Sequence, residues 1–164
     1  MKQRWMQAKF YALRGILPAL LTAVVLTLLA APPAAAQVDL DVRTGVYSDE
    51  SDLFVGAGVL GQMGSSPWFY NPNVEWVFVE NGDLITFNLD FHRDFDLDGP
   101  LTAWLGAGPA VVLRSPDVGD DEADPGLNLL AGAGFSGGAV RPYLQGKILV
   151  SDDTQAVLAF GLRF

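Results

Sequence analysis

The chain has 164 residues, enough for one domain, and no cysteine, so disulfide bonds cannot stabilise it. Its 19 Asp and Glu residues outnumber its 10 Lys and Arg residues, for a formal net charge of −9. Proteins that bind nucleic acids need a basic face toward the phosphates, so this acidity argues against a nucleic-acid partner.

The first 36 residues have the three parts of a cleaved secretory signal peptide. All of their charge is basic, an apolar run follows at 16–30, and Ala34, Ala35 and Ala36 form an A-x-A cleavage site. A permanent membrane anchor is the weaker alternative, because a spanning helix needs roughly 20 apolar residues and two prolines follow this run. We expect cleavage after Ala36, which leaves residues 37–164 with six bases, nineteen acids and a formal charge of −13.

After Gln37 the side chains alternate in character with a period of two, which predicts β-strands. Turn signals such as Asn81-Gly82 and Gly137-Gly138 separate the strands, and only the connection 115–125 is long. Pro109 lies within a strand, where it removes a donor and predicts a bulge or a local register change. In chain order the eight predicted strands cover residues 38–46, 53–60, 74–79, 85–92, 101–113, 127–135, 142–150 and 157–164.

The two faces of these strands differ in a way that predicts a membrane barrel. One face is apolar, while the other carries most of the charge and many glycines, which suit a narrow lumen crowded with side chains. Apolar-out, polar-in strands of even number are typical of outer-membrane barrels, and closure pairs every backbone group. We therefore predict an all-β, eight-stranded antiparallel up-and-down transmembrane β-barrel over residues 37–164. The alternative is a soluble periplasmic lipocalin-like ligand binder. The glycines of the second face are Gly56, Gly58, Gly106, Gly108, Gly132, Gly134 and Gly161.

The C-terminal segment LAFGLRF, which ends at Phe164, resembles the targeting signal of bacterial outer-membrane proteins. In that family the terminal aromatic residue is read by the barrel-assembly machinery. The mature chain, with WLGAGPAVVL at 104–113, also resembles the small OmpA/OmpX-type barrels. The resemblance implies location in the outer membrane, contact with lipid and lipopolysaccharide, and a monomer. The outer loops are shorter than in adhesive members, which argues against an adhesion role.

The even strand number places both ends of the barrel in the periplasm, so the connections 48–52, 80–83, 115–125 and 151–155 are expected outside. Arg93 has the parity of the lipid face, near a strand end from which it can reach the interface. Six aromatic residues are expected to form a belt at the periplasmic rim. They are Trp68, Phe69, Tyr70, Phe95, Phe135 and Phe164.

The inward face is expected to hold paired charges, because a buried charge is tolerated only when it is paired and hydrogen-bonded. Arg163 is expected to pair with Asp39 or Asp41 across the closing seam. Eight strands leave an interior only wide enough for side chains, so a plugged lumen is favoured over the alternative of a narrow pore for ions or small solutes. The predicted inward residues are Asp39, Asp41, Arg43, Glu75, Asp90, His92, Arg114, Arg141, Tyr143, Lys147 and Arg163.

His92 is the only histidine, and it lies between Asp90 and Asp94 on the predicted inner face. A carboxylate there would orient it as a general base. Some eight-stranded outer-membrane barrels are lipid A-modifying enzymes that use a His with a Ser. No Ser lies within two residues of His92, and this histidine is predicted near the periplasmic end, away from the lipid. We therefore predict no enzyme, with lipid A modification as the alternative.

The segment DFDLDG at 94–99 has the residue order that starts a calcium loop, with Asp94, Asp96 and Asp98 as the weak candidate ligands. Position twelve of such a loop would be Leu105 instead of Glu, and no helices flank it. Asp-Gly turns between strands are common, so no metal or other cofactor is expected. The acidic outer loops could attract divalent cations, but a charge run is usually solvated. The predicted function is a structural or envelope-interaction role.

Overall fold

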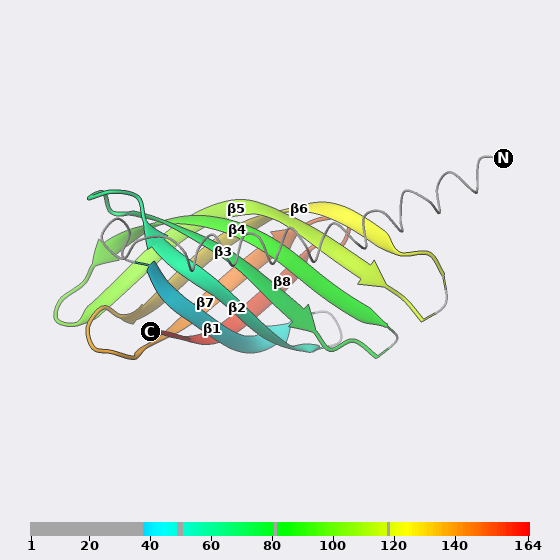
Figure 1. Ribbon diagram of the computed structural model, residues 1–164, viewed down its shortest axis with the longest axis horizontal. Helices are drawn as coiled ribbons and strands as arrows, with labels where there is room; N and C mark the ends of the chain where they lie inside the picture. Colours follow the sequence, from blue (N-terminus) through cyan, green and yellow to red (C-terminus); the bar gives the residue numbers. More distant parts are fainter. Residues whose placement is uncertain (1–37, 49–50, 81, 118) are drawn as a thin grey trace. The chain divides into compact units, whose positions relative to one another are not determined.

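The computed structural model describes residues 38–48, 51–80, 82–117 and 119–164, which form one closed β-barrel (Figure 1). Each strand pairs antiparallel with its sequence neighbours, and β8 closes the barrel against β1. No helix in this described part is long and apolar enough to cross a membrane. The predicted signal peptide and its cleavage site lie outside the described residues. The strands are β1 (Val38–Tyr47), β2 (Leu53–Gln62), β3 (Trp68–Val77), β4 (Asp83–Asp96), β5 (Leu101–Ser115), β6 (Glu122–Phe135), β7 (Arg141–Val150) and β8 (Gln155–Arg163).

Three strands extend at least four residues beyond a predicted end, and the connection predicted to be long is short. β3 begins at Trp68 instead of residue 74, β4 continues to Asp96, and β6 begins at Glu122. Because β5 and β6 pair as far as Arg114 opposite Glu122, only residues 116–121 connect them. These extensions contain polar residues or proline, which interrupt the apolar alternation that signals a strand. The backbone nevertheless continues the ladder of its neighbour.

The bulge predicted at Pro109 is absent. The β5–β6 register is continuous past Pro109, which lies opposite Leu127. The β4–β5 ladder keeps one register on both sides, with Asn88 opposite Ala110 and Phe91 opposite Ala107. A proline removes one donor without adding a residue, so the ladder to β4 is interrupted locally and no register shift results.

The outer face of the barrel is apolar and the inner face is polar, as predicted. Leu53, Leu105 and Leu144 project outward and are 57% to 60% exposed, whereas Asp41 and Thr86 inside the barrel are 0% exposed. A soluble lipocalin-like barrel requires the opposite arrangement, so that alternative is wrong for this fold. An exposed apolar surface that encircles a barrel is what a lipid environment covers.

We name the two ends of the barrel after what they carry. The terminal end contains Val38, Phe164 and the connections 63–67, 97–100 and 136–140. The acidic end contains the connections 48–52, 78–82, 116–121 and 151–154. Inside the acidic end lies an apolar cluster, which we name the plug. Its members are Tyr47, Phe54, Val77, Leu84, Ala110, Val112, Leu149, Val157 and Ala159.

The last residue of the chain is hydrogen-bonded into the barrel. The Phe164 amide donates to the Leu40 carbonyl at 2.9 Å, and the Leu40 amide donates to the Phe164 carbonyl at 3.3 Å. The Phe164 side chain projects outward and is 48% exposed. The terminal residue therefore completes the seam between β1 and β8 while its ring faces the surroundings of the barrel.

Five of the six predicted belt residues project from the outer face at the terminal end. Trp68, Phe95, Phe135 and Phe164 are exposed, and Tyr70 packs over Gly61 of the neighbouring strand. The sixth prediction, Phe69, is wrong. Because it alternates with Trp68 and Tyr70 on β3, its ring points into the barrel, where it stacks on the ring of His92.

Candidate functional site

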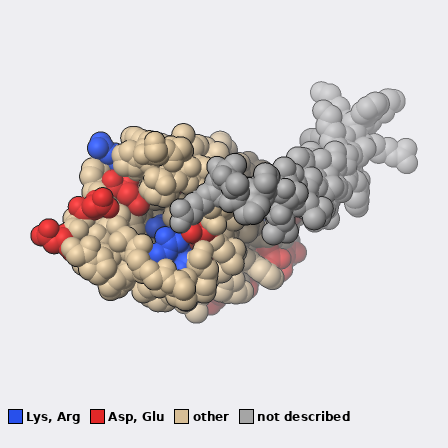
Figure 2. All heavy atoms as spheres, turned by 60° about the vertical axis from the view of Figure 1, so that its left-hand side comes forward, with Lys and Arg blue, Asp and Glu red and all other residues tan. Residues whose placement is uncertain are grey.

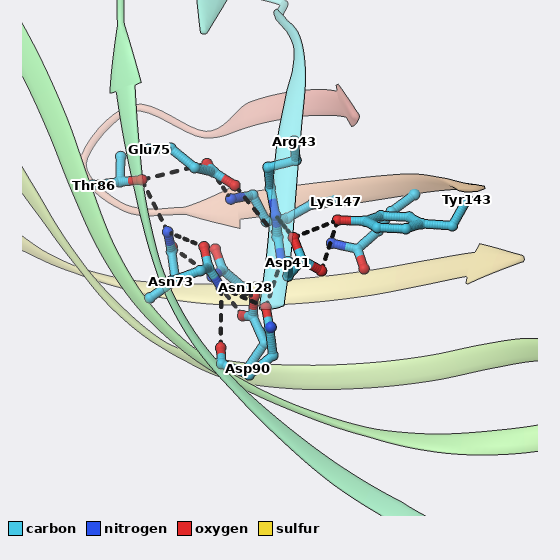
Figure 3. A network of polar contacts seen from close by, with 12 residues as sticks. Asp41, Arg43, Asn73, Glu75, Thr86, Asp90, Asn128, Tyr143 and Lys147 are labelled. Atoms are coloured by element: carbon cyan, nitrogen blue, oxygen red, sulfur yellow. Dashed lines mark hydrogen bonds and ion pairs between the residues drawn. The ribbon is translucent and has the colours of Figure 1, made fainter. Parts of the chain in front are cut away.

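The middle of the lumen holds a network of buried charged side chains centred on Glu75 of β3 (Figure 3). Lys147 of β7 donates to Glu75 Oε2 at 2.7 Å, and the Tyr47 hydroxyl donates to the same oxygen. An Arg43 nitrogen lies 3.6 Å from the other carboxylate oxygen, Oε1. Residues from β1, β3 and β7 thus meet across the barrel, where Arg43 and Lys147 both lie close to the Glu75 carboxylate.

Asp41 of β1 is the second carboxylate of this network. Arg43 Nε donates to its Oδ1 at 3.0 Å, and the Tyr143 hydroxyl lies 2.9 and 3.0 Å from its two oxygens. Arg163 Nε is 3.5 Å from Asp41 Oδ2, which selects Asp41 from the two partners predicted for Arg163. Asp39 instead pairs with Arg141. Asp41 therefore has three polar partners inside the lumen, and they come from β1, β7 and β8.

Asp90 is held by amides instead of by cations. Asn73 Nδ2 donates to its Oδ2 at 3.0 Å, and Asn128 Nδ2 donates to its Oδ1 at 2.8 Å. Asn88 joins the two, since it donates to Asn73 and accepts from Asn128. None of these three asparagines is among the predicted inward residues. Asn88 and Asn128 have inward parity within predicted strands, and Asn73 lies just before one, so extending the alternation would have found them.

The buried charges inside the barrel are balanced. Among the described residues, the buried acids are Asp41, Glu75 and Asp90, and the buried bases are Arg43, Lys147 and Arg163. The remaining predicted inward bases lie nearer the ends, where Arg141 pairs with Asp39 and Arg114 pairs with Asp153. The predicted lumen of paired charges is confirmed, with an amide component that was not predicted.

Two inward glycines make room for large rings below this network. The Trp104 ring lies against Gly132 of β6, and the Tyr143 ring lies against Gly161 of β8, so a side chain at either glycine would collide with a ring. The Arg163 guanidinium lies 4.4 Å from the Trp104 ring centroid and 4.6 Å from that of Tyr143. The glycines predicted to suit a crowded lumen therefore have a direct steric role.

His92 is enclosed within the lumen and is 1% exposed. Its Nδ1 lies 2.8 Å from Asp94 Oδ1, so Asp94 is its carboxylate partner, while Asp90 is engaged by the asparagines. Its ring stacks on Phe69 with centroids 5.5 Å apart, and the Trp104 ring centroid is 5.7 Å away. Nε2 is buried without a hydrogen-bond partner among the described residues. The geometry has the oriented histidine of an acid–base pair, but rings flank it on the inside of the barrel.

A cavity of about 400 Å³ opens at the terminal end. Its lining includes Gln62, Ser66, Phe69, Asp94, Arg141 and Arg163. Figure 2 brings this end of the barrel forward and shows basic side chains, with acidic ones beside them, in a hollow between uncharged residues. Trp104 is also part of the lining, so the cavity is a vestibule that stops at the layer of rings.

The weak calcium site predicted at Asp94, Asp96 and Asp98 is not assembled as a cluster. Asp94 and Asp96 belong to β4, where the Asp94 carboxylate is engaged by His92, and Asp98 lies in the following turn. Gly99 has the positive φ of 79° that a tight turn needs. Within the described ranges, no group of three or more His, Asp or Glu side chains is placed to hold a metal ion.

No protein-family profile and no curated protein sequence matches this chain. Several solved structures do. The structure of Neisserial surface protein A has a TM-score of 0.60 and 16% identity, covering 77% of this chain and 94% of that one. The N-terminal β-barrel domain of Pseudomonas aeruginosa OprF has a TM-score of 0.59 and 16% identity, covering 79% and 99%.

The outer membrane enzyme PagL is similar to a lesser degree, with a TM-score of 0.54 and 14% identity, covering 77% of this chain and 98% of that chain. Identities this low show a shared fold and leave the activity undetermined. Together with the apolar exterior, the shared fold supports a location in the outer membrane. The chain has the fold of the small eight-stranded outer-membrane β-barrels.

Proposed function

We propose that this protein is an integral outer-membrane barrel with a sealed lumen, and that it has a structural or envelope-interaction role without turnover or transport. The observation that carries the proposal is the filling of the lumen in three successive layers. The plug occupies the acidic end, the Glu75–Asp41–Asp90 network occupies the middle, and Trp104, Tyr143 and His92 form a layer of rings beneath it.

The filling of the lumen argues against a narrow pore. A hydrated ion would have to displace the Tyr47 and Phe54 rings, which pack edge to face with centroids 5.4 Å apart. It would then have to separate Lys147 from Glu75, whose charges are buried and directly bonded. Apolar constrictions exclude water, and breaking a buried ion pair is strongly unfavourable. Each step raises the barrier to conduction.

The remaining parts of the proposal concern biogenesis and surroundings. The leader over residues 1–36 directs export, and the segment ending at Phe164 is read by the assembly machinery. The terminal end then faces the periplasm and the acidic end faces outward, as in other outer-membrane barrels with both termini inside. The exposed apolar face contacts lipid and lipopolysaccharide, and the barrel functions as a monomer.

Two measurements test this proposal. Membranes from expressing cells are washed with carbonate or urea, and we expect the protein to stay in the membrane fraction. Release of folded protein without detergent would contradict the membrane location. The purified barrel is then reconstituted into planar bilayers, where we expect no sustained conductance. Stable open steps with ion selectivity would contradict the sealed lumen and identify the protein as a channel.

The enzymatic alternative has its own test. The enclosure of His92 between aromatic rings supports the absence of turnover, because a lipid substrate on the outer face does not reach its Nε2. We expect the acylation pattern of lipid A to be unchanged when the protein is expressed. A change in that pattern that disappears with His92→Ala would establish an enzyme and overturn this part of the proposal.

A further inference from the structure

The outer face of the described barrel carries a single basic side chain. The outward positions of the eight strands hold apolar, small or uncharged residues, with two exceptions in the described chain. Asp83 begins β4 at the acidic end, where it meets Ser115. Arg93 lies on the same strand near the terminal end. A charge on the lipid-facing side of such a barrel is costly at mid-depth and tolerated near the interface. Arg93 therefore needs a polar or anionic partner at the interface.

Arg93 is surrounded by aromatic and aliphatic side chains. Its neighbours across the sheet are Trp68 of β3 and Leu105 of β5, and Phe95 is next on the same face of β4. Trp68 and Phe95 are 46% and 41% exposed, as expected for interfacial aromatic residues. The Arg93 guanidinium lies 5.3 Å from the centroid of the Phe95 ring, so one face of the cation is already covered.

The guanidinium lacks an anionic partner within the described protein. The nearby inward acids are engaged elsewhere, since Asp94 bonds to His92 and Asp39 pairs with Arg141. Among the described residues, no carboxylate forms an ion pair with Arg93, which instead lies against the Phe95 ring. Guanidinium offers five N–H donors in a planar fork that fits the oxygens of a phosphate, and a ring contact leaves these donors unsatisfied.

We propose that Arg93, Trp68 and Phe95 form a binding site for the phosphate group of a phospholipid in the leaflet at the terminal end. The inference rests on the proposed function, because the membrane location and orientation make this the periplasmic leaflet. The phosphate accepts hydrogen bonds from the guanidinium, the two rings border the head group, and the acyl chains lie along the apolar strands. The site recognises the phosphodiester charge and holds the terminal end of the barrel at a defined depth.

The test uses the full protein purified from membranes in octyl glucoside, a detergent without phosphate. Native mass spectrometry counts the lipid molecules retained as dilauroyl phosphatidylglycerol is added, and an uncharged galactolipid with the same acyl chains is compared. We expect the phosphatidylglycerol to be retained about tenfold more strongly than the galactolipid, the size expected for one charge-assisted contact. Arg93→Gln should abolish this preference, and Arg93→Lys should retain part of it.

Arg114→Gln is the matched control, because it removes one inward-facing base from the acidic end and should leave the preference unchanged. Equal loss in Arg114→Gln and Arg93→Gln would overturn the site, since net charge alone would then explain the retention. Retention of the preference in Arg93→Gln would overturn it as well. A millimolar excess of inorganic phosphate should not displace the lipid, and displacement would assign the site to free phosphate instead of a phospholipid.

The failure of this inference is distinguishable from failure of the proposed function. Each variant is first checked for the heat-dependent gel mobility of a folded barrel and for resistance to the carbonate wash. A folded, wash-resistant barrel without lipid preference overturns the site and leaves the proposed function intact. A protein released by the wash overturns the membrane location, and the lipid site with it.

Discussion

The buried middle of this barrel and its acidic end contain charge in opposite arrangements. In the middle, three acids face three bases, and each carboxylate has at least two polar partners. At the acidic end, the described residues include one base, Arg114, among ten acids. Those acids are Asp52, Glu80, Asp83, Asp117, Asp120, Asp121, Glu122, Asp124, Asp152 and Asp153.

The difference follows from solvation. Water and salt screen the like charges of the exposed end, so a large imbalance there is compatible with a folded barrel. Inside the lumen a charge has lost its water and depends on the partners that the neighbouring strands supply. A charged residue therefore contributes differently to stability in the two regions. Substitutions in each region measure this contribution as a change in the free energy of unfolding.

The largest effect is expected from Glu75→Leu. The substitution leaves Lys147 without its carboxylate and removes one of the two acids near Arg43, so buried positive charge is uncompensated. We expect a loss of about 3 to 5 kcal/mol in the free energy of unfolding. Urea-dependent unfolding of the barrel in lipid vesicles measures it. The double variant Glu75→Leu, Lys147→Met restores charge balance and should recover most of the loss, whereas a double variant as unstable as the single one would contradict this account.

Phe54→Ala should have the next largest effect. Phe54 is 0% exposed and packs against Tyr47 in the plug, so truncation leaves a cavity and costs about 3 kcal/mol in the same unfolding measurement. The neighbouring Leu53 faces outward and is 60% exposed, which makes Leu53→Ala the matched control with a smaller expected loss. The Phe54→Ala barrel should still show no sustained conductance in planar bilayers, because the polar network and the layer of rings continue to fill the lumen. Equal losses for the two variants would show that the plug contributes nothing specific.

Phe164→Asp separates assembly from stability. An acid on the lipid face near the interface costs about 0 to 1 kcal/mol, so refolding into detergent should succeed. In cells we expect degradation or periplasmic accumulation, measured by fractionation, because the terminal aromatic residue is proposed to be read during insertion. Arg163→Ala is the control, since Arg163 points inward to Asp41, and it should lower the melting temperature without blocking insertion. Normal insertion of Phe164→Asp in cells would contradict a role in targeting and would show that the terminal ring is simply one more lipid-facing residue.

The smallest effect is expected from Asp153→Asn at the acidic end. Asp153 lies 3.1 Å from Arg114, but its side chain is 64% exposed. An exposed pair of this kind contributes about 0 to 1 kcal/mol, and the substitution also relieves repulsion among neighbouring acids. We expect a change below about 0.5 kcal/mol in urea-dependent unfolding, and less at high salt. A loss of unfolding free energy comparable to that of Glu75→Leu would contradict the distinction between buried charges in the lumen and exposed charges at the acidic end.

Much of the fold could be predicted from the sequence because a barrel strand repeats every two residues. The alternation in Ile85–His92 correctly assigned Asp90 and His92 to the lumen, and the alternation in the last strand assigned Phe164 to the outer face. A side-chain period reports which face a residue occupies, whichever strand lies beside it. The same reasoning failed where the pattern weakens, at Phe69 and the asparagines that follow it.

The tertiary structure alone decided which inward residues meet. Lys147 reaches Glu75 from 72 positions along the chain, and Tyr143 reaches Asp41 from 102 positions away. The period of a strand does not specify the stagger between strands, and this stagger sets the height of each side chain in the lumen. The stagger also places the plug at one end of the lumen and the vestibule at the other. Inward parity is a local property of the sequence, whereas the partner of each buried charge depends on closure of the whole barrel.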